Sequence, residues 1–356
     1  MPTSSEAVLR RWIKSVPHFD TEAARAASER QSRLTKPPGS LGRLEEASVQ
    51  LAGILGSPRP MISGKAVVVA AGDHGVAAEG VSAYPQEVTA QMVLNFLRGG
   101  AAINVLARHA GADVVVVDMG VATPLPPHEL LRVVHIADGT GNIARGPAMT
   151  GEQACEALVG GGEVALELAH SGHNLLAFGD MGIANTTPSA AIIAAVSGRP
   201  AEEVVGRGTG VEGEAYDNKV RVVRQALEIN APDPSDALDV LTQVGGFEIA
   251  GLAGAMLAAA TCRCALVLDG VISTAAALIA AGLEPRVRDF MLASHRSVEP
   301  GHRVALDLLG LEPLFDFNLR LGEGTGAVLA FPVIEAAARI LNEMASFEEA
   351  GVSDRD

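Results

Sequence analysis

Six short apolar runs, separated by longer stretches of helical periodicity, constrain the fold of this 356-residue chain most strongly. Only the third run contains a polar residue, His135. Such runs are typical of strands buried on both faces of a parallel sheet. The alternation with helical segments at 87–108, 151–170 and 240–260 predicts an α/β fold built from βαβ units. The runs cover residues 66–71, 114–117, 133–137, 175–178, 265–268 and 290–293.

The two ends of the chain differ from its middle. Residues 1–60 contain no apolar run of this type, and their helical patterns cover 5–16, 21–33 and 43–55. A further helical run covers 330–350. We therefore expect a small helical domain made of residues 1–60 and 330–356, and a large α/β domain made of residues 61–329.

Charge and cysteine content narrow the function classes. A net charge of -15 argues against nonspecific binding to nucleic acid or to an anionic membrane, because both need clustered Lys and Arg. Three cysteines are typical of a reducing compartment, so we expect a cytoplasmic protein without a disulfide framework. Cys262 and Cys264 have no further His or Cys at ligand spacing, so we expect no metal site.

A polar loop follows each apolar run. Ligands of open α/β sheets bind outside the carboxyl ends of the strands, so the six loops indicate one shared site. Asp-Gly pairs are also ordinary turn residues, which explains any single loop but not the whole set. The polar residues that follow the runs are Asp73, His74, Asp118, Asp138, Asp180, Asp269, Ser294 and His295.

Glu323 is the best single candidate for catalysis. It has a glycine on each side and precedes an apolar segment of helical character. Glycine permits positive φ and a close approach of the backbone to a ligand. An acid held on such a turn is poorly explained by solubility alone.

Two glycine-rich loops indicate a phosphorylated substrate. Residues 179–187 follow a strand and open a helix, where backbone N–H groups, Asn185 and Thr186 could bind an anion. Residues 206–210 form the second loop, with Arg207 and, further on, Lys219 as cations. Neither loop matches a Walker or dinucleotide fingerprint, and plain turn formation is the alternative for each.

The roles of two pairs of polar residues stay open. Asp73 and His74 could act as general base and orienter, or they could brace neighbouring loops. Ser294 and His295 fit a polar network that supports a site from behind.

Another group of residues could line a pocket for a planar ligand. Ser82 and Gln91 offer polar groups, and Tyr84 offers a flat ring; a buried structural tyrosine is the alternative. Lys36 lies in a loop rich in Pro and Gly. It could reach a phosphate or carboxylate, or be the solvated lysine of a rigid connector.

Taken with their order, these motifs resemble the nicotinate-nucleotide:dimethylbenzimidazole phosphoribosyltransferases, over about Leu34 to Gly351. The resemblance implies a Rossmann-like large domain with a six-stranded parallel sheet, a small helical domain from both termini, a homodimer and no cofactor. Six segments carry it: 34–42, 71–75, 141–146, 245–251, 294–302 and 320–327.

The implied reaction moves phosphoribose from nicotinate mononucleotide to 5,6-dimethylbenzimidazole, giving nicotinate and α-ribazole 5′-phosphate with inversion at C1′. The resemblance places the general base on Glu323. Nicotinate leaves as a neutral ring, whereas the benzimidazole must lose its N–H proton, so one base and no acid is required.

The resemblance also implies the binding residues. Asp180 and Ala184 depart from the family's pattern, in which Glu and Gly are frequent, so an auxiliary-base role at position 180 stays open. For the acceptor we expect Ser82, Tyr84, Gln91, Met181 and Leu321. For phosphoribose and nicotinate we expect Gly179, Asp180, Gly182, Ile183, Asn185, Thr186, Arg207, Gly208 and Lys219. The supporting residues are Asp73, His74, Ser294 and His295.

Other functions remain to be weighed. A related transferase could use another benzimidazole, a purine or a phenolic acceptor. The intact Glu323 turn argues against a non-catalytic binding protein, and the missing Gly-x-Gly-x-x-Gly fingerprint argues against a nucleotide-dependent oxidoreductase.

Overall fold

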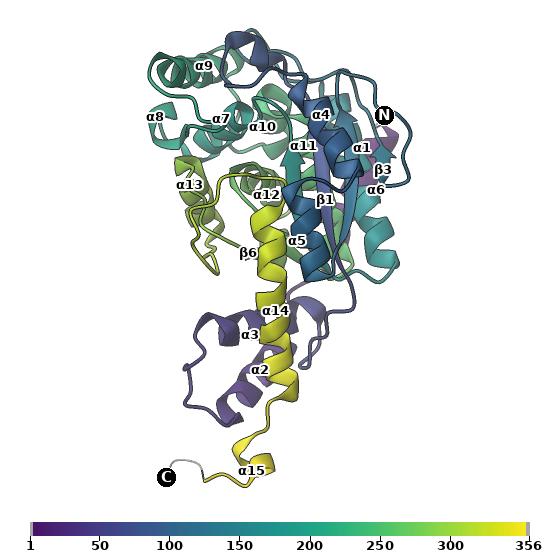
Figure 1. The fold of residues 1–356 in the computed structure, drawn as a ribbon, viewed down its shortest axis with the longest axis vertical. Coiled ribbons are helices and arrows are strands. Elements are labelled where there is room, and N and C mark those ends of the chain that lie inside the picture. The colour runs from purple at the N-terminus through teal and green to yellow at the C-terminus, as the bar shows by residue number, and fades with distance from the viewer. Residues whose placement is uncertain (1–2, 354–356) are drawn as a thin grey trace.

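A computed structural model describes residues 3–353. Within them, six strands form one parallel sheet in the order β3-β2-β1-β4-β5-β6, the doubly wound order of Rossmann folds (Figure 1). The predicted fold class is confirmed. The strands are β1 (Lys65–Gly72), β2 (Asp113–Gly120), β3 (Leu131–Val133), β4 (Leu175–Met181), β5 (Ala265–Leu268) and β6 (Met291–Ala293).

The prediction for the third strand is wrong in its bounds. β3 ends at Val133, where the predicted run begins. Beyond it, His135 adopts a positive φ of 40°. The backbone N–H groups of Val134 and His135 both donate to the carbonyl of Asp118, at 3.0 and 2.8 Å. This pattern ends the regular hydrogen-bond ladder between β2 and β3, so the apolar residues after Val133 belong to a loop.

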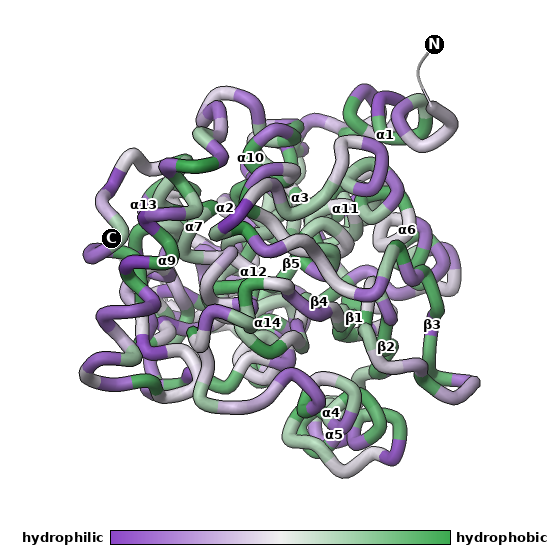
Figure 2. Tube along the Cα trace, turned by 90° about the horizontal axis from the view of Figure 1, so that it is seen from above, coloured by the Kyte–Doolittle hydropathy of each residue, from purple (hydrophilic) through white to green (hydrophobic). Residues whose placement is uncertain are grey.

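Helices cover both faces of the sheet. Figure 2 shows α6 (Gly151–His170) and α11 (Phe247–Thr261) on one side of the strands and α4 (Val88–Leu97) and α5 (Ala102–Ala110) on the other. Small residues let the first two helices pack closely, because a side chain on Gly254 would collide with the backbone of Leu158 in α6. The abundance of Ala and Gly therefore serves close helix packing.

Two predicted long helices are each divided in two. Residues 87–108 form α4 and α5, separated at Gly99, which has a φ of 75°. Residues 240–260 fall in α10 (Ala237–Val244) and α11, separated by Gly245 and Gly246. In both cases the apolar periodicity runs on across glycines that end the first helix.

The lower part of Figure 1 is a helical lobe. It contains α2 (Thr21–Arg33), α3 (Arg43–Leu55) and the C-terminal half of α14 (Thr325–Glu343). Ala27, Ala52 and Leu341 form its own small core. In contrast, α1 (Ser4–Ser15) packs on α6 of the sheet layer. The domain boundaries at residues 60 and 330 stay a prediction.

Helix α14 joins the lobe to the sheet. It packs on β4, β5 and α5 at one end and on α3 at the other. By length and composition it is the one helix among residues 3–353 that could cross a membrane, and more than half of it is buried inside the protein. The remaining elements are η1 (Gly75–Glu79), α7 (Thr186–Ser197), α8 (Ala201–Val204), α9 (Glu214–Asn230), α12 (Val271–Leu283), η2 (Pro285–Phe290), α13 (Pro300–Leu309) and α15 (Phe347–Ala350).

Candidate active site

Glu323 lies on a strained turn at the start of α14. It has a φ of 63°, between Gly322 at 84° and Gly324 at 85°. For a non-glycine residue this conformation costs about 1–3 kcal/mol, and such strain is typical of functional sites. The turn packs directly on β4, because a side chain on Gly179 would collide with the backbone of Glu323.

Asp269 anchors this turn to the sheet. It follows β5, and its carboxylate accepts the N–H groups of Gly324 at 3.1 Å and Ala327 at 3.0 Å. Burial raises the pKa of Asp269 to about 6, although these backbone N–H groups favour its ionised form. The partners lie 55 and 58 residues away in the chain, so only the fold brings them together.

The carboxylate of Glu323 is buried and sparsely bonded. Its Oε2 accepts one long hydrogen bond, 3.4 Å, from the N–H of Ile103 in the first turn of α5. Burial raises the pKa of Glu323, and the charge of Asp269 adds to this rise. A raised pKa makes a carboxylate a stronger base, which suits proton abstraction from an aromatic N–H.

Asp180 is a second carboxyl group beside the turn. Its Oδ1 lies 3.3 Å from the position that a side chain on Gly322 would occupy. Its Oδ2 accepts from the Asn185 side chain at 2.9 Å, and Oδ1 has no partner among the described residues. Burial, with the charges of Asp269, Glu248 and Glu323, raises the pKa of Asp180 to about 8, so it is protonated at neutral pH.

A cavity of about 300 Å³ opens beside Asp180, the glycine loops, and Leu321 and Gly322 of the turn; Glu323 itself is not among its lining residues. Seven of the sequence-predicted residues line it, together with residues from the loops after β5 and β6. The seven are Tyr84, Asp180, Asn185, Thr186, Gly208, His295 and Leu321. The structure therefore brings residues from distant parts of the chain to one cavity beside the Glu323 turn.

The wall of the cavity at Thr186 is suited to a phosphate, and Lys219, which does not itself line the cavity, is bonded to Thr186. The ammonium group of Lys219 donates to Thr186 Oγ1 at 2.7 Å and to the Gly206 carbonyl at 3.1 Å. Burial lowers the pKa of Lys219 to about 8, while the negative charge of Glu299 opposes the shift. A hydroxyl, a cation and a helix N-terminus at Thr186 together favour an anion.

Another part of the cavity wall is more exposed. Tyr84 is 56% exposed and Leu321 58% exposed, and both line the cavity. Tyr84 is therefore not the buried structural tyrosine of the alternative interpretation. Ser82 is bonded to Thr209 Oγ1 at 3.2 Å, beside the same opening.

Several predicted residues lie off this cavity. Gln91 is exposed on α4, and Met181 is half-buried at the end of β4; neither lines it. Arg207 is exposed and pairs with Glu212 at 2.7 Å. Lys36 is buried in the helical lobe, 2.8 Å from Glu45 Oε1, so it is neither a solvated lysine nor near this cavity.

The residues predicted to support the site form buried contacts. His74 Nε2 lies 2.8 Å from Glu248 Oε1, and Asp73 Oδ2 accepts from Ala122 N at 2.9 Å. Ser294 donates to the carbonyl of Leu268 at 2.6 Å. His295 lines the cavity, and burial lowers its pKa to about 4, so its ring is neutral.

Sequence reasoning missed several residues that line the cavity. Glu299 and Ser297 belong to a predicted polar cluster, but nothing in their spacing assigns them to the cavity wall. Thr209 and Arg320 lie within the predicted motifs 206–210 and 320–327 but are not selected. Among residues 3–353 no three His, Cys, Asp or Glu side chains gather closely enough to hold a metal ion.

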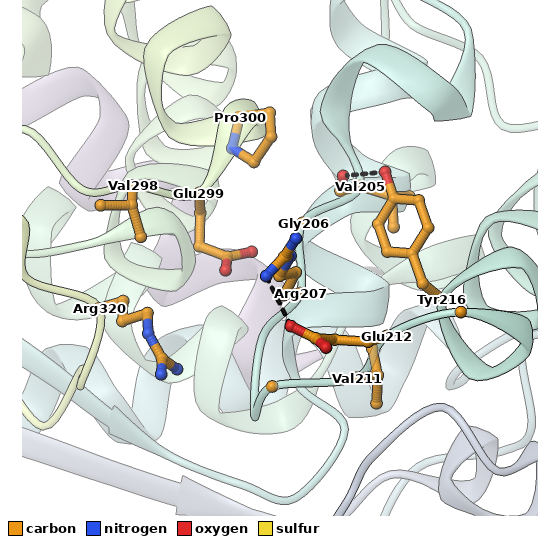
Figure 3. A pocket seen from close by; sticks show the side chains of 12 residues that line it. Val205, Gly206, Arg207, Val211, Glu212, Tyr216, Val298, Glu299, Pro300 and Arg320 are labelled. Carbon is orange, nitrogen blue, oxygen red and sulfur yellow. Dashed lines mark hydrogen bonds and ion pairs between the residues drawn. The ribbon is translucent and has the colours of Figure 1, made fainter.

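A larger cavity of about 850 Å³ adjoins the first (Figure 3). The two share Glu299 and Arg320, and the larger one is lined mainly by residues 205–216. It contains neither the Glu323 turn nor Asp180. We therefore assign the chemistry to the smaller cavity.

A buried acid beside a cavity at the carboxyl edge of a doubly wound sheet defines an α/β enzyme. A family model described as a phosphoribosyltransferase matches residues 16–352, nearly the whole chain. The chain belongs to this family, and it is a transferase acting on ribosyl phosphate. This confirms the resemblance on which the predicted site residues rest.

Individual proteins show the same relationship. Proteins named nicotinate-nucleotide–dimethylbenzimidazole phosphoribosyltransferase from Chloroflexus aurantiacus and Geobacter sulfurreducens are each 56% identical to this chain, over 96% and 98% of it and 98% and 99% of their own lengths. A crystal structure of the enzyme so named from Thermus thermophilus superposes with a TM-score of 0.90 at 51% identity. The match covers 95% of this chain and all of that one.

Proposed function

We propose that this chain transfers phosphoribose from nicotinate mononucleotide to 5,6-dimethylbenzimidazole, with inversion at C1′ and Glu323 as general base. The names of its relatives support the pair of substrates. The observation that carries the proposal is the buried Glu323 on its strained turn, beside a cavity with an anion-binding wall.

In the proposed reaction, one ring nitrogen of the benzimidazole attacks C1′ while the bond from C1′ to the nicotinate nitrogen breaks. The bonding electrons return to the pyridinium ring, which leaves as neutral nicotinate. The proton on the other benzimidazole nitrogen passes to Glu323. The ionised carboxylate also stabilises the oxocarbenium-like transition state.

The residues around the cavity fit both substrates of this reaction. Lys219 and Thr186 would bind the 5′-phosphate of the donor, with the loop amides of 206–210 nearby. Tyr84 and Leu321 would hold the flat acceptor. Because these two side chains are more than half exposed, a related acceptor such as another benzimidazole, a purine or a phenol is the second candidate.

We also propose that the protein is a cytoplasmic homodimer without a cofactor. The test of the reaction is incubation with nicotinate mononucleotide and 5,6-dimethylbenzimidazole, followed by chromatography for nicotinate and α-ribazole 5′-phosphate. No product from the wild-type protein would refute the proposed reaction. Product with a purine or phenol only would establish the second candidate.

Glu323→Gln tests the general base. It should retain the fold and substrate affinity and lower kcat by about 10²–10⁴-fold, because the amide cannot accept the proton. Steady-state kinetics and calorimetric binding measure the two effects. A kcat within about twofold of wild type would mean that another group is the base.

A further inference from the structure

Glu299 lies in the wall between the two cavities, at a point that the proposed reaction leaves unused. It is the N-cap residue of α13, lines both cavities and is only 6% exposed. Figure 3 shows its carboxylate directed toward Gly206 and Arg207. A buried carboxylate next to a phosphate-binding wall needs a reason, because it would repel the ligand.

The contacts of Glu299 are with the backbone of the glycine loop. Its Oε1 accepts the N–H of Gly208 at 2.9 Å. Its Oε2 fills the space where a side chain on Gly206 would lie. Glu299 therefore holds the loop from one side, and the loop needs glycine at position 206 to accept it.

Lys219 holds the same loop from the other side. Its ammonium donates to the Gly206 carbonyl at 3.1 Å and to Thr186 Oγ1 at 2.7 Å. A side chain on Gly208 would lie 2.8 Å from this ammonium. The loop is thus clamped between a buried anion and a buried cation.

Few other charges act on this clamp. Arg207 is exposed and paired with Glu212, and the guanidinium of Arg320 donates to the Gly208 carbonyl at 3.3 Å. Glu299 is the ionisable group whose charge raises the pKa of Lys219 against the effect of burial. Removing that charge would deprotonate Lys219 at a lower pH.

We propose that Glu299 is a positioning residue for the donor phosphate. It fixes the 206–208 loop, to which Lys219 is also bonded, in the shape that presents Lys219 and Thr186 to the phosphate. This inference deepens the proposed function and rests on it for the identity of the donor.

Glu299→Gln tests the proposal, because it keeps an oxygen for the Gly208 N–H and removes the charge. The KM for nicotinate mononucleotide should rise about tenfold, with kcat within about twofold, since binding of the ground state and of the transition state is weakened equally. The fall of kcat/KM above neutral pH should begin about one pH unit lower than in wild type. Glu203→Gln, an exposed glutamate on α8, is the matched control and should change neither value.

A second measurement does not depend on turnover. Ribose 5-phosphate is fully dianionic above about pH 7.5, because the second pKa of a phosphate monoester is about 6. Calorimetry should show weaker binding to Glu299→Gln than to wild type, with a larger difference at pH 9 than at pH 7.5. If wild type binds ribose 5-phosphate but forms no product, the proposed reaction is refuted. The binding difference between Glu299→Gln and wild type still tests the role of Glu299.

The opposite sign would overturn the proposal. Tighter binding by Glu299→Gln would mean that the carboxylate competes with the phosphate for the Gly208 amide. Unchanged binding and pH dependence would mean that Glu299 neither positions the loop for the phosphate nor competes with the phosphate. If Glu299→Gln does not fold, Glu299→Asp replaces it; the shorter side chain keeps the charge, so it should weaken binding without moving the pH profile.

Discussion

The two halves of the sheet's carboxyl edge carry similar residues in different arrangements. After β4 and β6, Asp180 and His295 line the cavity, and after β5 Asp269 holds the Glu323 turn beside it; burial raises the pKa values of Asp180 and Asp269. After β1 and β2, polar groups bond to one another instead. Asp118 accepts from the N–H groups of Gly120 at 3.0 Å and Val121 at 2.9 Å.

The expectation of one site shared by all six strand ends is therefore wrong for half of the sheet. Asp73, His74, Asp118 and Asp138 do not line the cavity. His135 lies between Asp118 and Asp138, at 3.1 Å from each. A polar residue at a strand end is thus a weak sign of function unless it also lines a cavity.

Substitutions should separate the two halves by the sign of their effect on stability. Changes on the β1–β3 side should destabilise, because they break contacts within the protein. Changes at Asp180, Ala184 and Glu323 on the β4–β6 side should stabilise, because strained or like-charged groups there are retained for catalysis.

The largest effect is expected at the pair of His74 and Glu248. Both side chains are at most 1% exposed. Glu248→Ala should lower the free energy of unfolding by about 3 kcal/mol, because it leaves the imidazole buried without its partner. Urea denaturation measures this loss. Glu323→Gly is the control, since it removes a buried glutamate and also relieves the strain of its positive φ of 63°; an equal loss in both variants would contradict the comparison.

Asp180→Asn should show an effect on stability that depends on pH. The pKa of Asp180 is raised to about 8 in the folded protein, so between about pH 4 and 8 only the folded state holds this proton. The folded state therefore loses stability as pH rises, by up to ~1.4 kcal/mol per pH unit from this group. Asparagine does not titrate, so Asp180→Asn does not lose stability from this position as pH rises.

The difference between variant and wild type isolates this group from the other titrating residues. Asp180→Asn should be increasingly more stable than wild type in urea denaturation from pH 5 to pH 8. Because Asp180 is neutral at pH 7, the variant should also keep most of its activity there. A stability difference that does not change with pH would show that Asp180 is ionised throughout, and would reopen its role as auxiliary base.

Much of the fold follows from the sequence, and the exceptions have local causes. Unbroken apolar runs predict five of the six strands because a parallel sheet buries both faces. The third fails because the backbone at His135 turns to positive φ. The long helices fail at glycines, since periodicity continues across a break that involves only two residues, as at Gly245 and Gly246.

The candidate site is predictable where its signal is local. Glu323 is visible between its glycines, and Lys219 is selected together with a glycine-rich loop. Asp269 as the anchor of the turn is not visible, because its partners lie 55 and 58 residues away. Glu299 is not visible as part of the wall for the same reason: its partner Gly208 is 91 residues away.

The smallest effect is expected at Ala184, which shares the left-handed backbone of Glu323 on the β4 side. Ala184 has a φ of 76°, so Ala184→Gly should raise the free energy of unfolding by about 1 kcal/mol and keep kcat within about twofold. Glu323→Gly should stabilise by a similar amount but abolish turnover. Ala231→Gly, at a φ of 41° at the end of α9, is a control away from the cavity and should also stabilise. A less stable Ala184→Gly protein would mean that contacts of the buried methyl group stabilise the left-handed conformation at this position.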